Sequence, residues 1–214
     1  MLSAKLCKMP MVVWFMLNLG VLVSGGGSNL QAIIDAIESG TIKNAEIALV
    51  ISTNHNAYAL ERAKNHGIDT LVLAKKDFAD ANDRETVLLE ALTARNVGLL
   101  ALCGSLMILS KQFIQDFNKP IINVHPALLP AFGGKGFYGL RVHEAVLAAG
   151  VSVTGATVHH VEAGIDTGSI ILQREVPVHH DDTPQSLQQR VMQEAEWIIL
   201  PEVISMFAEG SYSL

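Results

Sequence analysis

Asn123 and His125 are two residues apart. Asn123 lies within a short apolar run, 121–124, and His125 directly follows that run. Residues two apart on a strand point to the same side, so the amide and the imidazole are predicted to project into one crevice. An amide can donate a hydrogen bond to a developing oxyanion, and an imidazole can be protonated near neutral pH. The alternative interpretation is a capping asparagine and a core histidine. The two residues alone leave both alternatives open.

Asp166 lies in a short loop between two glycines, Gly164 and Gly168. A carboxylate beside His125 would hold the imidazole in one tautomer and raise its pKa. Taken alone, an aspartate between glycines is usually a turn residue. Asn123, His125 and Asp166 are therefore the candidate catalytic set, on the condition that the fold brings them together.

A glycine-rich segment, 24–29, separates a predicted strand from a predicted helix, where backbone N–H groups and the helix dipole can hold a phosphate. The alternative is a tight turn with Ser28 as the helix cap. A dinucleotide site is disfavoured because Leu30 replaces the third glycine of that motif. A mononucleotide or a sugar phosphate fits better. The candidate phosphate-binding residues are Gly26, Gly27, Ser28 and Asn29.

Other segments resemble metal-binding or nucleophile motifs only in part. His143-Glu144 begins like a zinc-protease motif, but Leu147 occupies the position of its second histidine. The adjacent pairs at 159–160 and 179–180 point to opposite faces if extended, which disfavours joint chelation. The chain contains no G-x-S-x-G nucleophile motif. We therefore predict no metal and no covalent nucleophile.

Two later segments contain polar residues of interest. Gly134-Lys135 invites comparison with a nucleotide-triphosphate loop, but Gly136 replaces the required serine or threonine. Gln193 and Glu196 are three residues apart in a predicted helix, so they share a face that could touch a ligand. A solvated polar face is the common alternative.

The elements that must position these residues alternate along the chain. Their apolar runs are continuous, which is typical of parallel strands buried on both faces. The pattern predicts an α/β fold: a doubly wound, mostly parallel, Rossmann-like sheet with a late antiparallel hairpin. Strands are predicted at 19–23, 47–51, 70–73, 98–102, 121–124, 152–161 and 169–176, and helices at 28–40, 57–65, 83–95, 143–149 and 183–207.

Composition narrows the class of protein. The chain has 214 residues, of which 50% are hydrophobic and 17% charged, so a disordered or coiled-coil chain is disfavoured. A net charge of -6 without a basic run argues against nucleic-acid binding. Cys7 and Cys103 have no framework spacing, which favours reduced thiols and a cytoplasmic protein.

The first residues only superficially resemble a signal peptide. Lys5 and Lys8 precede an apolar stretch, 9–17, but Pro10 interrupts it and it is too short to span a membrane. We interpret residues 1–15 as an upstream extension or a start-site artefact. Residues 16–214 are predicted to form a single domain, and no membrane association is expected.

Three motifs together resemble the phosphoribosylglycinamide formyltransferases, within the wider family of formyltransferases that use 10-formyltetrahydrofolate. They are V-S-G-G-G-S-N-L-Q-A-I at 23–33, I-N-V-H-P-A-L-L-P at 122–130, and T-G-A-T-V-H-H-V at 154–161 with G-I-D-T-G at 164–168. The resemblance runs from about Met16 to the C-terminus, and it implies the formyltransferase fold.

The resemblance also implies a reaction of de novo purine biosynthesis. The amine of 5-phosphoribosylglycinamide would attack the formyl group of 10-formyltetrahydrofolate, the co-substrate, and no metal would be needed. By resemblance, Asn123 binds the oxyanion, His125 stabilises it or moves protons, and Asp166 supports His125. Family positions near the ribosyl phosphate correspond to Gln193 and Glu196. The implied folate-binding residues are Arg84, Leu106, Met107, Ile108 and Leu109.

Some residues depart from the family pattern. The segment 105–107 replaces a Phe/Tyr-Met-Arg sequence in the folate loop, and 133–136 replaces a Pro-Gly-Leu stretch. Trp197 stands where a histidine is common. The family uses small-molecule substrates, and a monomer or a homodimer is expected.

Three other functions compete. A 10-formyltetrahydrofolate hydrolase uses a similar set of residues but usually has an additional regulatory domain. A methionyl-transfer-RNA formyltransferase would need an RNA-binding extension and a positive surface. A noncatalytic sugar-phosphate-binding protein would retain the sheet and the glycine loop, and would leave Asn123, His125 and Asp166 without a role.

Overall fold

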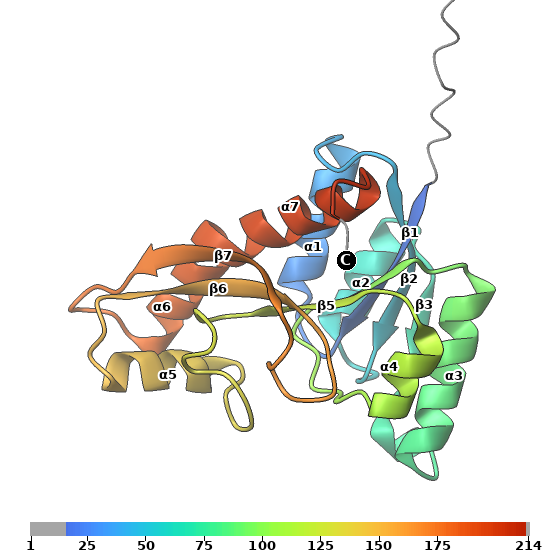
Figure 1. Cartoon of the computed structure of the whole chain (residues 1–214), viewed down its shortest axis with the longest axis horizontal. Coiled ribbons are helices and arrows are strands. Elements are labelled where there is room, and N and C mark those ends of the chain that lie inside the picture. The colour runs from blue at the N-terminus through green and yellow to red at the C-terminus, as the bar shows by residue number, and fades with distance from the viewer. Residues whose placement is uncertain (1–15, 213–214) are drawn as a thin grey trace, which may run out of the picture.

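The computed structural model describes residues 16–212, so the predicted extension at 1–15 lies outside the described residues. A seven-stranded sheet runs through the molecule in the order β3-β2-β1-β4-β5-β6-β7 (Figure 1). Neighbouring strands from β3 to β5 are parallel, whereas β6 is antiparallel to both β5 and β7. The predicted fold is confirmed. The strands are β1 (Leu17–Val23), β2 (Ala45–Ser52), β3 (Thr70–Val72), β4 (Leu99–Leu102), β5 (Ile121–His125), β6 (Val153–His160) and β7 (Ile170–Pro177).

Helices cover both faces of the sheet (Figure 1). Buried side chains of α1, α2 and α5 to α7 join one apolar core, and those of α3 and α4 join a second core on the opposite face. This two-sided burial explains the continuous apolar runs of the central strands. The helices are α1 (Ser28–Glu38), α2 (Tyr58–Asn65), the short η1 (Lys75–Asp77), α3 (Ala81–Ala94), α4 (Lys111–Phe117), α5 (Leu140–Ala148), α6 (Pro184–Val191), the π-helix η2 (Met192–Glu196) and α7 (Trp197–Ala208).

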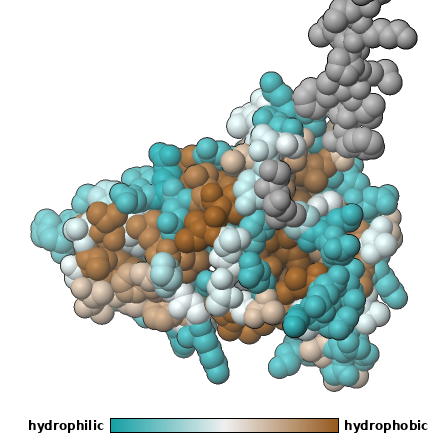
Figure 2. Space-filling model, viewed as in Figure 1, coloured by the Kyte–Doolittle hydropathy of each residue, from teal (hydrophilic) through white to brown (hydrophobic). Residues whose placement is uncertain are grey.

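Hydrophobic and hydrophilic residues occupy different regions of the molecular surface. Figure 2 shows hydrophobic residues in the middle of the viewed face, while hydrophilic residues cover the tip beyond β7 and the region of α3. Among the described residues, no helix is long and apolar enough to cross a membrane.

Helix α4 was not predicted. Phe113 and Phe117 are four residues apart, and both are buried against the second core. Ser110 caps the helix by accepting a hydrogen bond from the Phe113 N–H, and its own hydroxyl donates to the Glu85 carboxylate. The serine and the spacing of the phenylalanines were the signals available in the sequence.

The predicted helix 183–207 is divided by a π-helical turn into α6, η2 and α7. A π-turn bonds residues five apart, so residues three apart no longer lie one above the other. Glu196 is consequently buried, whereas Gln193 is exposed. The prediction that these two residues share a face is wrong for this reason.

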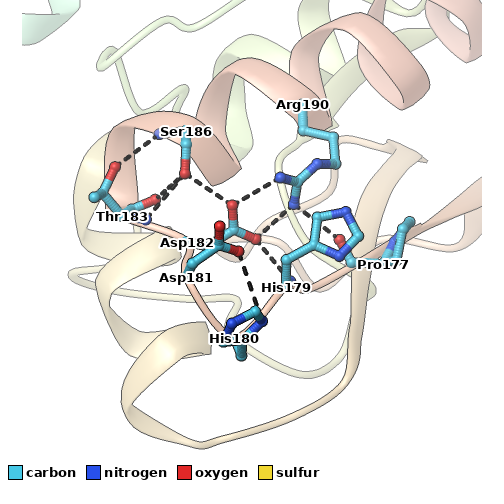
Figure 3. Close-up of polar contacts among 8 residues, drawn as sticks. All are labelled: Pro177, His179, His180, Asp181, Asp182, Thr183, Ser186 and Arg190. Carbon is cyan, nitrogen blue, oxygen red and sulfur yellow. Dashed lines mark hydrogen bonds and ion pairs between the residues drawn. The ribbon is translucent and has the colours of Figure 1, made fainter.

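Asp182 and Arg190 fasten the beginning of α6 to the end of β7 (Figure 3). The guanidinium forms two hydrogen bonds with the carboxylate and a third, at 3.1 Å, with the carbonyl oxygen of Pro177. The carboxylate also accepts from the Ser186 hydroxyl and the His179 N–H, each at 2.8 Å. The Arg190 guanidinium holds the pKa of the Asp182 carboxyl well below its usual range. We call this pair the α6 clamp.

Candidate active site

A cavity of about 780 Å³ lies at the carboxyl ends of β1, β4 and β5. Open α/β sheets bind their ligands at this edge. The walls are the loop 24–29, the segment 103–109, the loop 134–139, the β6–β7 loop around Asp166, and residues of α6 and η2. One cavity therefore contains the candidate catalytic set, the glycine-rich loop and most of the predicted folate segment.

The three candidate catalytic residues lie together, as predicted. Asn123 and His125 are on β5, and Asp166 reaches them from the β6–β7 loop. His125 Nδ1 is 3.5 Å from Asp166 Oδ2, while His125 Nε2 donates a hydrogen bond to the carbonyl oxygen of Phe132 at 2.8 Å. The Gly134 N–H donates to Asp166 Oδ2 at 2.9 Å. The 132–134 backbone thus holds both members of the His125–Asp166 pair.

His159 is a further member of this network that sequence reasoning missed. In the antiparallel pairing of β5 with β6, His159 lies directly opposite Asn123. Its Nδ1 donates to the carbonyl oxygen of His160 at 2.7 Å, so in the neutral ring Nε2 accepts from the Asn123 amide at 3.1 Å. This bond fixes the Asn123 amide with one N–H still available to a ligand.

The charges of the pair follow from its surroundings. Burial lowers the pKa of His125 below its ordinary value, although the negative charge of Asp166 acts in the opposite direction. The pKa of Asp166 is lowered despite its burial, because positive charge on His159, whose Nε2 lies 3.6 Å from Asp166 Oδ1, would stabilise the carboxylate, as do the hydrogen bond from the Gly134 N–H and positive charge on His125. The ground state is therefore a neutral imidazole beside an ionised carboxylate, ready to stabilise a proton that arrives at His125.

His143, on α5, also lines the cavity and was not predicted to be there. It is fully buried, and neither ring nitrogen has a hydrogen-bond partner among the described residues. Burial, together with the nearby His125, lowers the pKa of His143 to about 4. A neutral imidazole with two free nitrogens can bind a water molecule or a polar group of a ligand.

The glycine-rich loop forms one wall, and all four predicted residues, 26–29, line the cavity. Gly27 has a positive φ of 72°, and a Cβ there would come within 2.6 Å of the Ala59 side chain. Only glycine fits this position. The Ser24 hydroxyl bonds to Thr53 Oγ1 at 2.7 Å and accepts from the Leu106 N–H at 2.9 Å, which ties this loop to the 103–109 wall.

Glu196 and Asn29 form a buried polar pair at the base of the loop. The Asn29 amide donates to Glu196 Oε2 at 2.6 Å, while Asn29 Oδ1 has no partner among the described residues. Burial raises the pKa of Glu196 to about 7. The pair presents oxygen acceptors to a ligand that brings hydroxyl groups. Gln193, predicted beside it, is exposed and is not among the residues that line the cavity.

The predicted folate residues of the 103–109 wall all line the cavity. Leu106 and Ile108 are 65% and 68% exposed, whereas Met107 and Leu109 are buried and anchor the segment in the second core. Two exposed apolar side chains, two positions apart on this segment, offer a surface suited to a flat aromatic ring. Arg84 does not line the cavity, and its Nε is buried without a hydrogen-bond partner among the described residues.

Trp197 follows Glu196 directly and faces a second cavity, of about 720 Å³, between α1 and α7. Its indole Nε1 is buried without a hydrogen-bond partner within residues 16–212. Nothing in the structure explains the presence of tryptophan where the family resemblance leads one to expect histidine. The part of the chain that the structure describes contains no group of three histidine, cysteine or acidic residues placed to hold a metal ion.

Known proteins resemble this chain in sequence. A phosphoribosylglycinamide formyltransferase of Haemophilus influenzae is 39% identical over 199 residues, which cover 93% of this chain and 91% of that protein. A trifunctional purine biosynthetic protein of Drosophila melanogaster is 39% identical over 195 residues. These residues are 91% of this chain, and the chain spans only 14% of the length of that relative.

Solved structures agree with this result. A glycinamide ribonucleotide transformylase of Symbiobacterium toebii is 41% identical with a TM-score of 0.86, and the match covers 93% of this chain and 91% of that one. A phosphoribosylglycinamide formyltransferase of Coxiella burnetii is 38% identical with a TM-score of 0.84, covering 92% and 90%. The formyl transferase family model matches residues 17–204. Together with the shared geometry, these matches establish that the chain belongs to the formyl transferase family.

Proposed function

We propose that the protein transfers the formyl group of 10-formyltetrahydrofolate to the amine of 5-phosphoribosylglycinamide, in de novo purine biosynthesis. The observation that supports this most strongly is the placement of the Asn123, His125 and Asp166 set in one cavity with a glycine-rich loop and an apolar wall. A sugar phosphate and a flat folate ring can thus meet beside groups suited to acyl transfer. Relatives with this name match nearly the whole chain.

In the proposed reaction, the amine nitrogen forms a bond to the formyl carbon, and the carbonyl oxygen gains negative charge. The free N–H of Asn123, which His159 orients, donates to this oxygen. The carbon–nitrogen bond to the folate then breaks, and one proton passes from the attacking amine to the departing nitrogen. His125 and Asp166 lie beside this path, and the carboxylate stabilises the imidazolium that forms when His125 takes a proton.

The substrates would occupy neighbouring parts of the cavity. Backbone N–H groups of residues 26–29 and the N-terminus of α1 would hold the phosphate. Asn29 and Glu196 would accept hydrogen bonds from the ribose hydroxyls, which satisfies the free Asn29 Oδ1. Leu106 and Ile108 would contact the folate ring, with Met107 and Leu109 supporting them. Gln193 and Arg84 have no place in this arrangement.

We further propose that the protein works in the cytoplasm as a monomer or a homodimer and binds only small-molecule substrates. The net charge of -6 and the single described cysteine, a buried thiol, support this assignment.

The test is a spectrophotometric assay of 10-formyltetrahydrofolate conversion to tetrahydrofolate, with and without phosphoribosylglycinamide, and with the mass of the product measured. We expect turnover that requires the amine and a product with one added formyl group. Turnover without the amine would instead identify a hydrolase. Binding of sugar phosphate without turnover would identify a noncatalytic binding protein.

A further inference from the structure

The cavity is acidic apart from a single cation. Asp166 and Glu196 both line it, and Lys135 is the only lysine or arginine of the described chain that does. A phosphate monoester brings a charge of about -1.5 to -2 at neutral pH. Under the proposed function, on which this inference rests, such a group must bind in a cavity that already contains two carboxyl groups.

Arg62, a cation in contact with the glycine-rich loop, is engaged in other interactions. Arg62 donates from Nε to the carbonyl oxygen of Gly26 and from Nη1 to the side chain of Gln31, both at 2.9 Å. Its guanidinium also lies over the Tyr58 ring, 5.0 Å from the centroid. Arg62 lines the second cavity and not the first. It therefore supports the loop from behind.

Lys135 stands at the tip of a tight turn. The Phe137 N–H donates to the carbonyl oxygen of Gly134 at 3.2 Å, and Gly136 has a φ of +100°, as the third position of a type II turn requires. The base of the turn is fixed by the bond from Gly134 to Asp166. The Lys135 side chain itself is exposed and makes no hydrogen bond or ion pair with the described residues. Lys135 is thus a cation without a partner among the described residues, on a turn whose backbone is held by hydrogen bonds.

The elements that follow the turn lead from Lys135 towards the glycine-rich loop. The loop 134–139 leads directly into α5, which packs against α6. The next turn after α6 contains Met192, whose sulfur lies 3.8 Å from the Ser28 hydroxyl on the glycine-rich loop. Packing thus connects the 134–139 loop, through α5, α6 and Met192, to Ser28 of the glycine-rich loop.

We propose that Lys135 is a substrate-binding residue that pairs with the phosphate of phosphoribosylglycinamide and thereby replaces a cation in the glycine-rich loop itself. The loop supplies backbone N–H groups, and the lysine supplies a full positive charge. Since one charge-assisted hydrogen bond to an exposed ligand is lost on substitution, we expect binding to weaken about tenfold or more.

The kinetic test compares Lys135→Met, Lys135→Arg and the matched control Lys43→Met. Lys43 is exposed and lies between α1 and the start of β2, away from the cavity. Lys135→Met is expected to raise the KM for phosphoribosylglycinamide about tenfold or more, with the KM for 10-formyltetrahydrofolate and kcat unchanged within about twofold. In Lys135→Arg, the KM for phosphoribosylglycinamide should return most of the way to the wild-type value. Lys43→Met should leave both KM values and kcat unchanged. Increasing ionic strength should reduce the difference between wild type and Lys135→Met.

A binding measurement separates this proposal from the proposed function. Isothermal titration with ribose 5-phosphate needs no turnover, and we expect Lys135→Met to weaken its binding by a similar factor. A wild-type protein that binds ribose 5-phosphate through Lys135 but transfers no formyl group would refute the reaction and leave the lysine assignment intact. A rise only in the KM for the folate would assign Lys135 to the folate carboxylates. Either that result or unchanged binding in Lys135→Met would overturn the proposal.

Discussion

The cavity network and the α6 clamp both contain buried charged or polar groups, but their contacts differ. In the clamp, Asp182 accepts hydrogen bonds from Arg190, Ser186 and the backbone, and the Asp182 side chain is 2% exposed. In the cavity, the closest approach of His125 to Asp166 is 3.5 Å. His143 and Asn29 retain polar atoms without partners among the described residues.

This difference separates structural from functional polar groups. A buried polar group that has all its hydrogen bonds stabilises one conformation of the chain. One that lacks them costs free energy in the empty protein and can recover it when a ligand binds. Of the buried polar atoms without partners, those of Asn29 and His143 line the cavity, whereas those of Arg84 and Trp197 lie outside it. Four substitutions test this division, here in order of decreasing expected effect.

Asp166→Asn should lower kcat by about 100-fold or more, because the charge that stabilises the His125 imidazolium is lost. Asp166 has a φ of 56°, a left-handed conformation that asparagine tolerates, so the substitution removes charge without straining the loop. Steady-state kinetics with both substrates measure the effect, and circular dichroism checks the fold. Activity close to wild type would remove Asp166 from the mechanism.

Asp182→Ala should reduce the free energy of unfolding by about 2 to 4 kcal/mol, because Arg190 and two further donors lose their acceptor. The kcat of the folded enzyme should change far less than in Asp166→Asn. Denaturant titration gives the free energy of unfolding. A large loss of kcat at unchanged stability would place the clamp with the catalytic groups and break the division.

The clamp also predicts a pH dependence. The pKa of Asp182 is depressed in the folded state, whereas an unfolded aspartate titrates near about 3.9. The clamp's stabilisation is therefore fully present above about pH 4 and is lost as the pH falls through the native pKa. The difference in unfolding free energy between wild type and Asp182→Ala should shrink at pH 2 compared with pH 7. An equal difference at both pH values would contradict the assignment.

Glu196→Gln should raise the free energy of unfolding at neutral and higher pH, whereas Asp182→Ala should lower it. The pKa of Glu196 is raised to about 7, so its ionisation destabilises the empty protein as the pH rises from about 4.5 through 7. Relative to wild type, the glutamine variant should gain up to about 3 kcal/mol between pH 4 and pH 8. Substrate binding should weaken at the same time. A difference between the two proteins that does not vary with pH would refute the assignment.

Gln193→Ala should have the smallest effect, with less than about a threefold change in the KM for phosphoribosylglycinamide. The residue is exposed and does not line the cavity, although it lies only three positions from Glu196. The same kinetic assay measures it. A tenfold rise in KM would show that Gln193 reaches the substrate after all.

Much of this architecture was predictable because each signal was local. Continuous apolar runs and glycine-rich turns predicted the strands, the parallel sheet and the late hairpin. The spacing of Asn123 and His125 predicted their common direction, the loop between Gly164 and Gly168 suggested Asp166, and the family resemblance supplied the Leu106–Leu109 segment.

The remainder depended on relations that no local pattern contains. His159 joins the site because strand register places it opposite Asn123, and register is set by the assembled sheet. Gln193 lies outside the cavity because a π-turn changes the periodicity of the last helix. The partners of His125 and Asp166 at Phe132 and Gly134 are backbone groups, whose positions residue types do not reveal.

Trp197 directly follows the π-helix η2, and its indole is a natural fluorescent probe of this region. The indole is joined in sequence to Glu196, whose charge changes near pH 7, and it is one of only two tryptophans in the chain. In a Trp14→Phe background, fluorescence would therefore come from a single indole that follows Glu196 in the chain. A change in its emission during a titration with phosphoribosylglycinamide would then test, without any added dye or label, whether the substrate reaches Glu196.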